Sequence, residues 1–169
     1  MKKIVLAILF VSSIFAQNIK TGWFAGIEGG RTTTQTNDVT DTFFGIKLGT
    51  HFYDKNIYAI SNRVYGSLDR VTQTNSDFYK AQFNVDWIFN SLDYIKPFIG
   101  ANLGYIYFND NTNDTSHSTG TYGFQTGLLF YIGDIVELEI GAKLDYAVND
   151  NTFWQDTLKS GYASLNFSF

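Results

Sequence analysis

The sequence predicts an all-β fold, an eight-stranded antiparallel transmembrane β-barrel, from three observations. Between Ile135 and Ala147 every second side chain is apolar and the others are charged or glycine. This period of two is typical of a β-strand whose two faces meet opposite environments. Similar segments of about ten residues recur along the chain, as barrel strands do. The connections are alternately long and polar or short, which matches barrels with long outer loops and short periplasmic turns.

The first four strands are predicted at residues 23–31, 42–53, 57–68 and 79–87. In the first, second and fourth, apolar side chains alternate regularly with glycine, charged or amide side chains. The third is less regular, because Asn62 falls on its apolar face although Arg63 lies on the polar face. Polar loops are predicted after the first and third strands, and short turns after the second and fourth.

The last four strands are predicted at residues 96–108, 121–132, 135–147 and 158–169. Pro97 is tolerated because it stands at the start of a strand, where a missing N–H matters least. The longest polar loop follows the fifth strand, and a tight turn at Gly133-Asp134 precedes the seventh. The eighth strand ends in the aromatic Phe169.

The N-terminal sixteen residues predict a secretory signal peptide. Lys2 and Lys3 precede an apolar run over residues 4–11, and Ala16 is a small residue at the expected cleavage point. The run is shorter than the about 20 residues of a membrane-spanning helix. We therefore expect export through residues 1–16 and one mature barrel domain over residues 17–169.

Composition narrows the function classes. The chain has no cysteine, which excludes disulfides, thiolate chemistry and cysteine metal sites. Without residues 1–16, which carry two lysines and no acid, 10 basic residues face 16 acidic ones, and this balance argues against nucleic acid as a partner. No later stretch approaches 18 consecutive apolar residues, so a helical membrane protein is not expected.

Alternation alone does not decide whether the apolar face points inward or toward lipid. Glycines favour the lipid orientation, because a narrow eight-stranded lumen must mix small residues with large ones. Ten of the 15 glycines fall on the polar faces: Gly22, Gly26, Gly30, Gly45, Gly49, Gly100, Gly104, Gly123, Gly127 and Gly141. No charge falls on the apolar faces of the fourth to seventh strands away from their ends, as a lipid-facing surface requires.

The aromatic residues point the same way, since two girdles mark the two interfaces of a membrane barrel. The predicted periplasmic girdle consists of Trp23, Phe52, Tyr58, Trp87, Phe130, Phe167 and Phe169. The predicted outer girdle consists of Tyr105, Tyr107, Tyr122 and Tyr146.

The stretch from Pro97 to Tyr105 and the terminal YASLNFSF resemble small eight-stranded outer-membrane barrels of the opacity-protein and adhesin-like group. The resemblance covers the whole mature chain. It implies that the last strand is a signal for the barrel-assembly machinery. The residues that match this signal are Tyr162, Leu165, Phe167 and Phe169.

The predicted lumen holds charged residues of both signs. They are Glu28, Lys47, Arg63, Lys80, Asp86, Glu137, Glu139, Lys143 and Asp145. If the strands pair symmetrically, Glu28 lies opposite Lys47, and Lys47 opposite Arg63. We expect an ion-pair network that plugs the barrel and fixes its register. The functional alternative is a proton or ion path, or a gate.

The predicted outer loops are acidic. They contain Asp38, Asp41, Asp69, Asp77, Asp110, Asp114, Asp150 and Asp156. These carboxylates are expected to be solvated or to share divalent cations with lipopolysaccharide phosphates. Asn109 to Thr115 lacks the glycine and closing glutamate of a calcium loop. His117 lacks the His-x-Ser spacing of lipid A deacylases, because Thr119 occupies the second position after it.

These observations predict a non-enzymatic protein of a bacterial outer membrane, with no cofactor or metal and with both termini periplasmic. Its loops would serve envelope integrity or adhesion. The expected partners are outer-membrane lipid, lipopolysaccharide, the assembly machinery and an extracellular ligand at the loops, and the barrel is expected to be monomeric. The alternatives are a small or gated porin-like transport protein and a lipid A-modifying enzyme.

Overall fold

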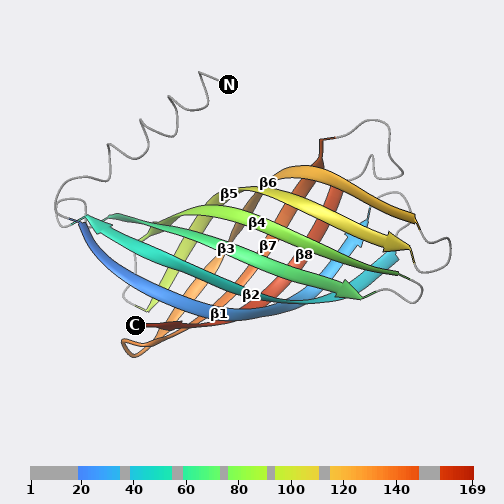
Figure 1. Ribbon diagram of the computed structural model, residues 1–169. Coiled ribbons are helices and arrows are strands. Elements are labelled where there is room, and N and C mark those ends of the chain that lie inside the picture. Colours follow the sequence, from blue (N-terminus) through green and yellow to red (C-terminus); the bar gives the residue numbers. More distant parts are fainter. Residues whose placement is uncertain are drawn as a thin grey trace, which may run out of the picture.

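The protein is described by a computed structural model (Figure 1). It describes residues 19–34, 39–54, 59–72, 76–90, 94–110, 115–148 and 157–169. The predicted signal peptide and its cleavage residue Ala16 lie outside these residues. Of the eight aspartates predicted in outer loops, four lie outside the described residues, Asp38, Asp114, Asp150 and Asp156, and four belong to strands, Asp41, Asp69, Asp77 and Asp110.

Eight strands close into an antiparallel barrel in which each pairs with its sequence neighbour and β1 pairs with β8. This confirms the predicted fold class. The strands are β1 Ile19–Thr34, β2 Val39–Asp54, β3 Ile60–Thr72, β4 Ser76–Phe89, β5 Ile95–Asp110, β6 Thr115–Ile132, β7 Val136–Ala147 and β8 Thr157–Ser168.

The described part of the chain contains no helix long and apolar enough to cross a membrane.

Several strands are longer than the hydropathy pattern predicts, most of all at the outer ends. β6 begins at Thr115, inside the predicted loop, and pairs with β5 from the first residue. β3 continues to Thr72, beyond the predicted end at residue 68. Apolar alternation is required only where a strand meets lipid, so a ladder that extends into water loses the pattern while its backbone pairing continues. Threonine, which is frequent here, suits such strands.

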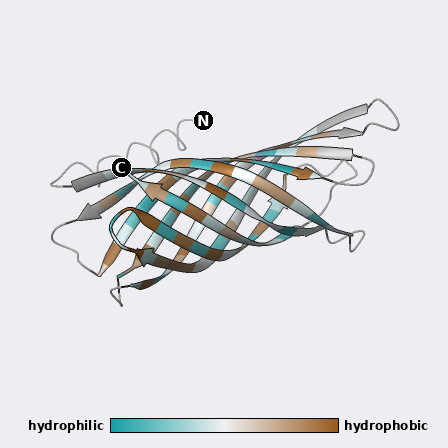
Figure 2. Ribbon diagram, turned by 90° about the horizontal axis from the view of Figure 1, so that it is seen from below, coloured by the Kyte–Doolittle hydropathy of each residue, from teal (hydrophilic) through white to brown (hydrophobic). Residues whose placement is uncertain are grey.

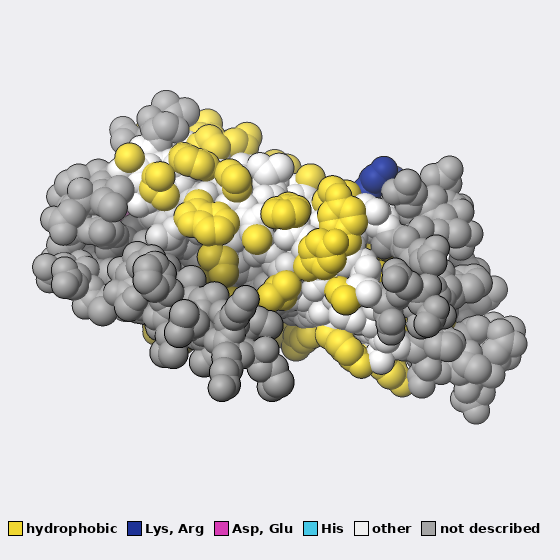
Figure 3. Space-filling view, turned by 90° about the horizontal axis from the view of Figure 1, so that it is seen from above, with side chains coloured by type: hydrophobic (Ala, Val, Ile, Leu, Met, Phe, Trp, Pro, Cys, Tyr) yellow, Lys and Arg dark blue, Asp and Glu magenta, His cyan; other side chains and the backbone are white. Residues whose placement is uncertain are grey.

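The burial pattern is inverted relative to a soluble protein (Figures 2 and 3). Leu48, Phe83 and Leu103 are more than half exposed around the outside, whereas Arg63, Asp86 and Glu139 are 0% exposed inside. Figure 2 shows apolar and polar residues alternating along the strands. Figure 3 shows hydrophobic side chains covering the described middle of one face, with a single basic patch near one end.

Many of the exposed aromatic residues lie near one end of the barrel or the other, although Phe83 and Phe124 are exposed in the middle of β4 and β6. Trp23, Trp87 and Phe167 are exposed toward the end that holds the β2–β3, β4–β5 and β6–β7 connections. Tyr105 and Tyr107 are exposed toward the opposite end. The side chain of Tyr58, assigned to the first girdle from the sequence, lies outside the described residues.

The expected symmetric pairing of the first three strands is wrong. Glu28 lies opposite Gly45, and Lys47 lies opposite Gly26 on one side and Ser67 on the other. Around Glu28 and Lys47 the observed register places a small residue directly opposite each charge, so that these two side chains meet diagonally. Arg63 and Lys80, by contrast, lie directly opposite Asp86 and Asp69 on the neighbouring strand.

Interior glycines make room for large interior side chains. Gly100 lies opposite Asp86, and a Cβ on it would collide with that carboxylate. Gly49 lies opposite Tyr65, and a Cβ there would lie 2.7 Å from the tyrosine Cα. The glycine pattern is therefore a space requirement of the lumen. Gly133 serves a different purpose, since its φ of 70° forms the predicted turn between β6 and β7.

A candidate interior charge network

The structure places all nine predicted lumen charges inside the barrel, each no more than 4% exposed. Asp69 joins them with 2% exposure, although the sequence interpretation assigned it to an outer loop. β3 continues past it with the same alternation, so its side chain shares the inner face with Arg63. The described interior thus holds four basic and six acidic residues in its central layers.

Arg63 is the centre of the network. Its Nη2 and Nε lie 2.6 and 3.0 Å from Asp86 Oδ2, on the neighbouring strand β4. Its Nη1 lies 3.0 Å from Glu137 Oε1 and 2.9 Å from Glu139 Oε2, both on β7 across the lumen. One planar guanidinium with five donors can satisfy three carboxylates in this way, whereas a lysine ammonium cannot match the geometry.

Two lysines extend the network toward β1. Lys47 Nζ lies 3.0 Å from both Glu28 Oε2 and Glu139 Oε2. Lys143 Nζ lies 2.7 Å from Glu28 Oε1. Tyr162 donates a hydrogen bond of 2.6 Å to Glu139 Oε1, so that this carboxylate has an arginine, a lysine and a phenol as partners.

A second group lies toward the outer end. Lys80 Nζ is 3.3 Å from Asp69 Oδ2 on β3 and 3.2 Å from Asp145 Oδ2 on β7. Gln82 donates to Asp145 Oδ1 at 3.1 Å and to Asn102 Oδ1 at 3.2 Å. The contacts of Lys80 and Gln82 with Asp145 connect β4 to β7, which are not neighbours, so they resist flattening or opening of the barrel.

Apolar and aromatic side chains close the interior around the charges. The Arg63 Cζ lies 4.9 Å from the centre of the Tyr65 ring, 5.3 Å from that of Phe98 and 5.5 Å from that of Phe24, within the range of cation–π attraction. Buried apolar residues lie toward the two ends of the lumen: Ile88, Phe98 and Leu129 at one end, and Phe43, Val71, Phe78, Ile106 and Leu158 at the other.

Two further polar side chains of the interior are His51 and Asp41. Among the described residues there is no group of three or more His, Asp or Glu side chains that could hold a metal ion. His51 is buried inside, with Nε2 3.7 Å from Glu137 Oε2. The side chain of His117 lies outside the described residues. Asp41, which the sequence interpretation placed in a solvated loop, faces the interior and is 8% exposed.

The four residues matched to the assembly signal lie on different faces of the barrel wall. Tyr162 is 4% exposed and faces the interior, whereas Phe167 and Phe169 are 46% and 77% exposed. Leu165 belongs to the outward-facing set because it alternates with the buried Ser164 and Asn166. Tyr162 therefore also belongs to the charge network, through its hydrogen bond to Glu139. The assembly role of the strand stays a prediction.

Sequence reasoning missed several interior residues. Tyr65 and Tyr162 are large aromatic residues that face the lumen. Gln125, which the alternation already places on the polar face of its strand, donates to both Tyr65 Oη and Asp86 Oδ1. Both tyrosines alternate with outward-facing neighbours, and this pattern could have identified them as interior residues. Asp69 would have been found by counting on from Arg63 in steps of two.

No protein-family model matches the chain, and no curated protein sequence is significantly similar to it. Solved structures do match. Neisserial surface protein A is 14% identical, with a TM-score of 0.64, covering 90% of this chain and 100% of that one.

Two further similar structures are an attachment protein and an enzyme. Ail, the attachment invasion locus protein of Yersinia pestis, in complex with the heparin analogue sucrose octasulfate, is 16% identical, has a TM-score of 0.54 and covers 90% of this chain and 100% of that one. The outer-membrane enzyme PagL is 14% identical and has a TM-score of 0.53, and the match covers 83% of this chain and 97% of that one. Because one fold serves several roles, this similarity shows the architecture alone. The chain has the fold of the small eight-stranded outer-membrane β-barrels.

Proposed function

We propose that this protein is an integral outer-membrane barrel of a Gram-negative bacterium that acts through its outer loops and not by catalysis or transport. The inverted burial is the observation that carries the proposal. Exposed Leu, Ile and Phe side chains surround the barrel while its ionised groups are sealed inside. An apolar belt of this extent in water would be an aggregation liability, whereas in a bilayer it faces acyl chains.

The interior supports a structural role. Arg63, Lys47, Lys80 and Lys143 all have carboxylate partners within 3.3 Å. Apolar side chains occupy both ends of the lumen. Eight strands leave an interior just wide enough for side chains to fill. Function then belongs to the outer connections, whose sequences are rich in aspartate.

We infer two roles for these loops, envelope integrity and adhesion. Loop carboxylates beside lipopolysaccharide phosphates can share divalent cations with them, which would link the protein to its surrounding lipid. Adhesion draws support from the similarity to Ail, whose name describes an attachment protein.

The experiment is a deletion strain complemented with chains that lack one outer loop at a time. Location is tested first: the protein should enter the outer-membrane fraction and show heat-modifiable gel mobility. Growth in detergent with EDTA and attachment to host cells are then measured for each loop variant. Full activity of all four variants in both assays would overturn the loop role.

An enzymatic role is tested separately because PagL shares the fold. Lipid A from cells that express the wild type, His117→Ala or no protein should give the same mass spectrum. A change that depends on the wild-type protein and is lost in His117→Ala would replace this proposal with a lipid A-modifying activity.

A further inference from the structure

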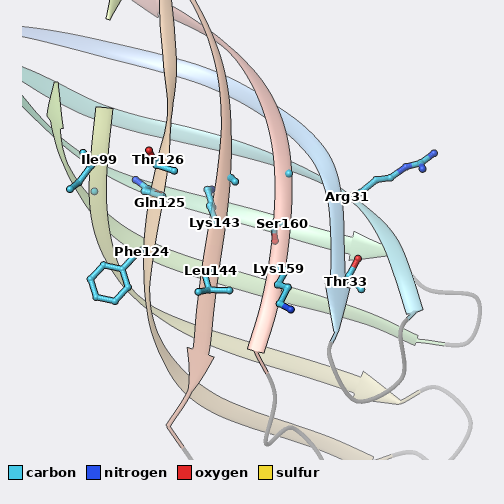
Figure 4. A pocket seen from close by; sticks show the side chains of 13 residues that line it. Arg31, Thr33, Ile99, Phe124, Gln125, Thr126, Lys143, Leu144, Lys159 and Ser160 are labelled. Atoms are coloured by element: carbon cyan, nitrogen blue, oxygen red, sulfur yellow. The ribbon is translucent and has the colours of Figure 1, made fainter. Parts of the chain in front are cut away.

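A groove crosses the outside of the barrel over strands β5, β6, β7, β8 and β1 (Figure 4). Its volume is about 770 Å³. Thr126, Ala142 and Gly161 form its floor, and they are direct cross-strand neighbours because Thr126 pairs with Ala142 and Ala142 with Gly161. The floor is therefore one continuous row of small outward-facing residues.

Larger side chains stand on both sides of this row. Phe124 pairs with Leu144 on one side, and Leu128 pairs with Ile140 on the other. Phe124, Leu128 and Ile140 are 61%, 40% and 52% exposed, so they project from the surface. Over β6 and β7 the small residues thus lie in a trench between two pairs of large side chains. Over β8 and β1 the trench is bounded by Lys159 and Thr33 on the outer side, and it is open on the other side, where Ala163 and Gly29 continue the flanking row.

The trench leads toward two cations at the outer end of the barrel. Ile99 pairs with Thr126 at one end of the row, and Arg31 pairs with Gly161 at the other. Lys159 pairs with Thr33 beside Arg31, and both basic side chains are exposed and line the groove (Figure 4). Arg31 lies near the end of β1 and Lys159 near the start of β8, both on the outer side.

The outward-facing charges show a consistent sign. Among strand residues with described side chains, those that are charged and exposed on the outer face are Arg31, Arg70 and Lys159. All three are basic, and all lie toward the outer ends of their strands. Only Arg31 and Lys159 adjoin each other, across the β1–β8 pair. This part of the rim complements an anionic headgroup.

We propose that the groove binds a phosphorylated glycolipid of the outer leaflet, the lipid A portion of lipopolysaccharide, with one acyl chain in the trench and a phosphate on Arg31 and Lys159. Four interstrand steps of about 4.8 Å give the row a length of about 19 Å. That length is comparable with one leaflet, about half of the roughly 30 Å hydrocarbon core. Strand tilt of about 35–45° makes the trench climb toward the outer rim.

The proposal rests on the proposed outer-membrane function and adds a specific lipid site to it. Phosphate contacts by arginine and lysine are charge-assisted and stronger than neutral hydrogen bonds. A cationic rim alone would not hold an acyl chain. The trench adds a surface on which one acyl chain packs against fixed side chains. Removing either part should therefore weaken binding by itself.

The chain offers a matched control on another part of the wall. A second outward groove of about 750 Å³ lies over β2 to β5 and includes Gly66 and Ala81, but its outward-facing lining contains no cation. A Cβ at Gly161 would meet nothing within 4 Å, and one at Gly66 would meet only the Gln82 carbonyl oxygen at 3.9 Å. Gly161→Leu and Gly66→Leu thus fill two different grooves without colliding with the backbone.

The test is native mass spectrometry of the full folded chain in detergent micelles. The added probes are bisphosphorylated lipid A and the same lipid with both phosphates removed. The wild type should retain one lipid A molecule. The double variant Arg31→Gln/Lys159→Gln should bind it about tenfold more weakly, and should bind the dephosphorylated lipid as the wild type does. Gly161→Leu should weaken binding of both lipids, and Gly66→Leu should weaken neither.

Equal lipid A binding by the wild type, the double variant and Gly161→Leu would overturn the site, as would an equal loss in Gly66→Leu. A wild-type dimer that Gly161→Leu dissociates would assign the groove to a second copy of the chain instead. Heat-modifiable gel mobility shows whether the chain has folded in the micelles, and so distinguishes failure of the lipid site from failure of the proposed function. A folded chain that shows no preference for lipid A would contradict the lipid site alone. A chain that does not fold in micelles would contradict the proposed function as well.

Discussion

Arg63 shows what a single residue contributes to this fold. It is 0% exposed and contacts Asp86, Glu137 and Glu139, which belong to two strands on different sides of the lumen. Buried ion pairs are weak evidence for net stability, but breaking one leaves an uncompensated charge in a dry interior. Here three carboxylates would lose their shared partner at once.

We therefore predict that Arg63→Met lowers the free energy of unfolding by about 3–5 kcal/mol. The measurement is urea-dependent unfolding in lipid vesicles, followed by tryptophan fluorescence and gel mobility. Arg70→Met is the control, because Arg70 is an exposed arginine on the outer face of the same strand. Equal, small effects of the two substitutions would show that the interior network is not held by Arg63.

A second prediction concerns the space beside Asp86. Gly100→Leu should prevent folding or destabilise the barrel by several kcal/mol, roughly the upper range of single substitutions, because even a Cβ collides with the Asp86 carboxylate and lies 2.7 Å from the Val85 carbonyl oxygen. Gly66→Leu, which points outward, should fold normally. The yield of heat-modifiable protein after refolding measures both. Normal folding of Gly100→Leu would contradict the observed register of β4 and β5.

At the scale of the strand, a substitution on the outward face of β5 tests whether this face meets lipid or water. Leu103 is 66% exposed near the middle of β5. In a soluble barrel, Leu103→Lys would change stability by only about 0.5 kcal/mol. On a lipid-facing wall near the midplane it should cost about 2–4 kcal/mol.

Unfolding of Leu103→Lys in vesicles is compared with that of Lys159→Leu. Lys159 already lies near the outer rim, where the cost of charge falls toward zero. Similar stability of Leu103→Lys and the wild type would place the strand's outer face in water.

The strands also show how far sequence reasoning reached. Alternation predicted the eight strands and their two faces, because lipid and lumen impose opposite chemistry on neighbouring residues. It did not predict the outer ends of β3 and β6, where exposed polar residues such as Arg70 and Ser118 replace apolar ones on the outer face and the pattern disappears. The register was also missed: Glu28 meets Lys47 diagonally, with Gly45 directly opposite. That offset depends on how side chains share a narrow interior, which one strand's pattern does not encode.

At the scale of the whole molecule, closure of the barrel explains why a chain without cysteine or a conventional core forms one structure. Every strand pairs on both sides, so no edge is left open. The interior is filled by a polar centre between apolar ends. The wall carries the apolar surface that lipid covers. Stability and membrane insertion thus depend on the same inversion.

A sealed interior also predicts that the barrel does not conduct ions. Purified protein in planar bilayers should show negligible conductance, because paired charges and the apolar side chains near Phe98 and Leu129 obstruct the lumen. A vesicle-swelling assay with small sugars checks the same point for uncharged solutes. Stable, reproducible single-channel openings would instead favour a porin-like role.

The most direct test of the inversion is folding of the purified mature chain with and without an amphiphile. After dilution from urea into lipid vesicles, it should give a β-rich circular dichroism spectrum and heat-modifiable gel mobility. After dilution into buffer alone, it should aggregate or stay unfolded. A monomeric, folded β-protein in buffer without lipid or detergent would contradict the account.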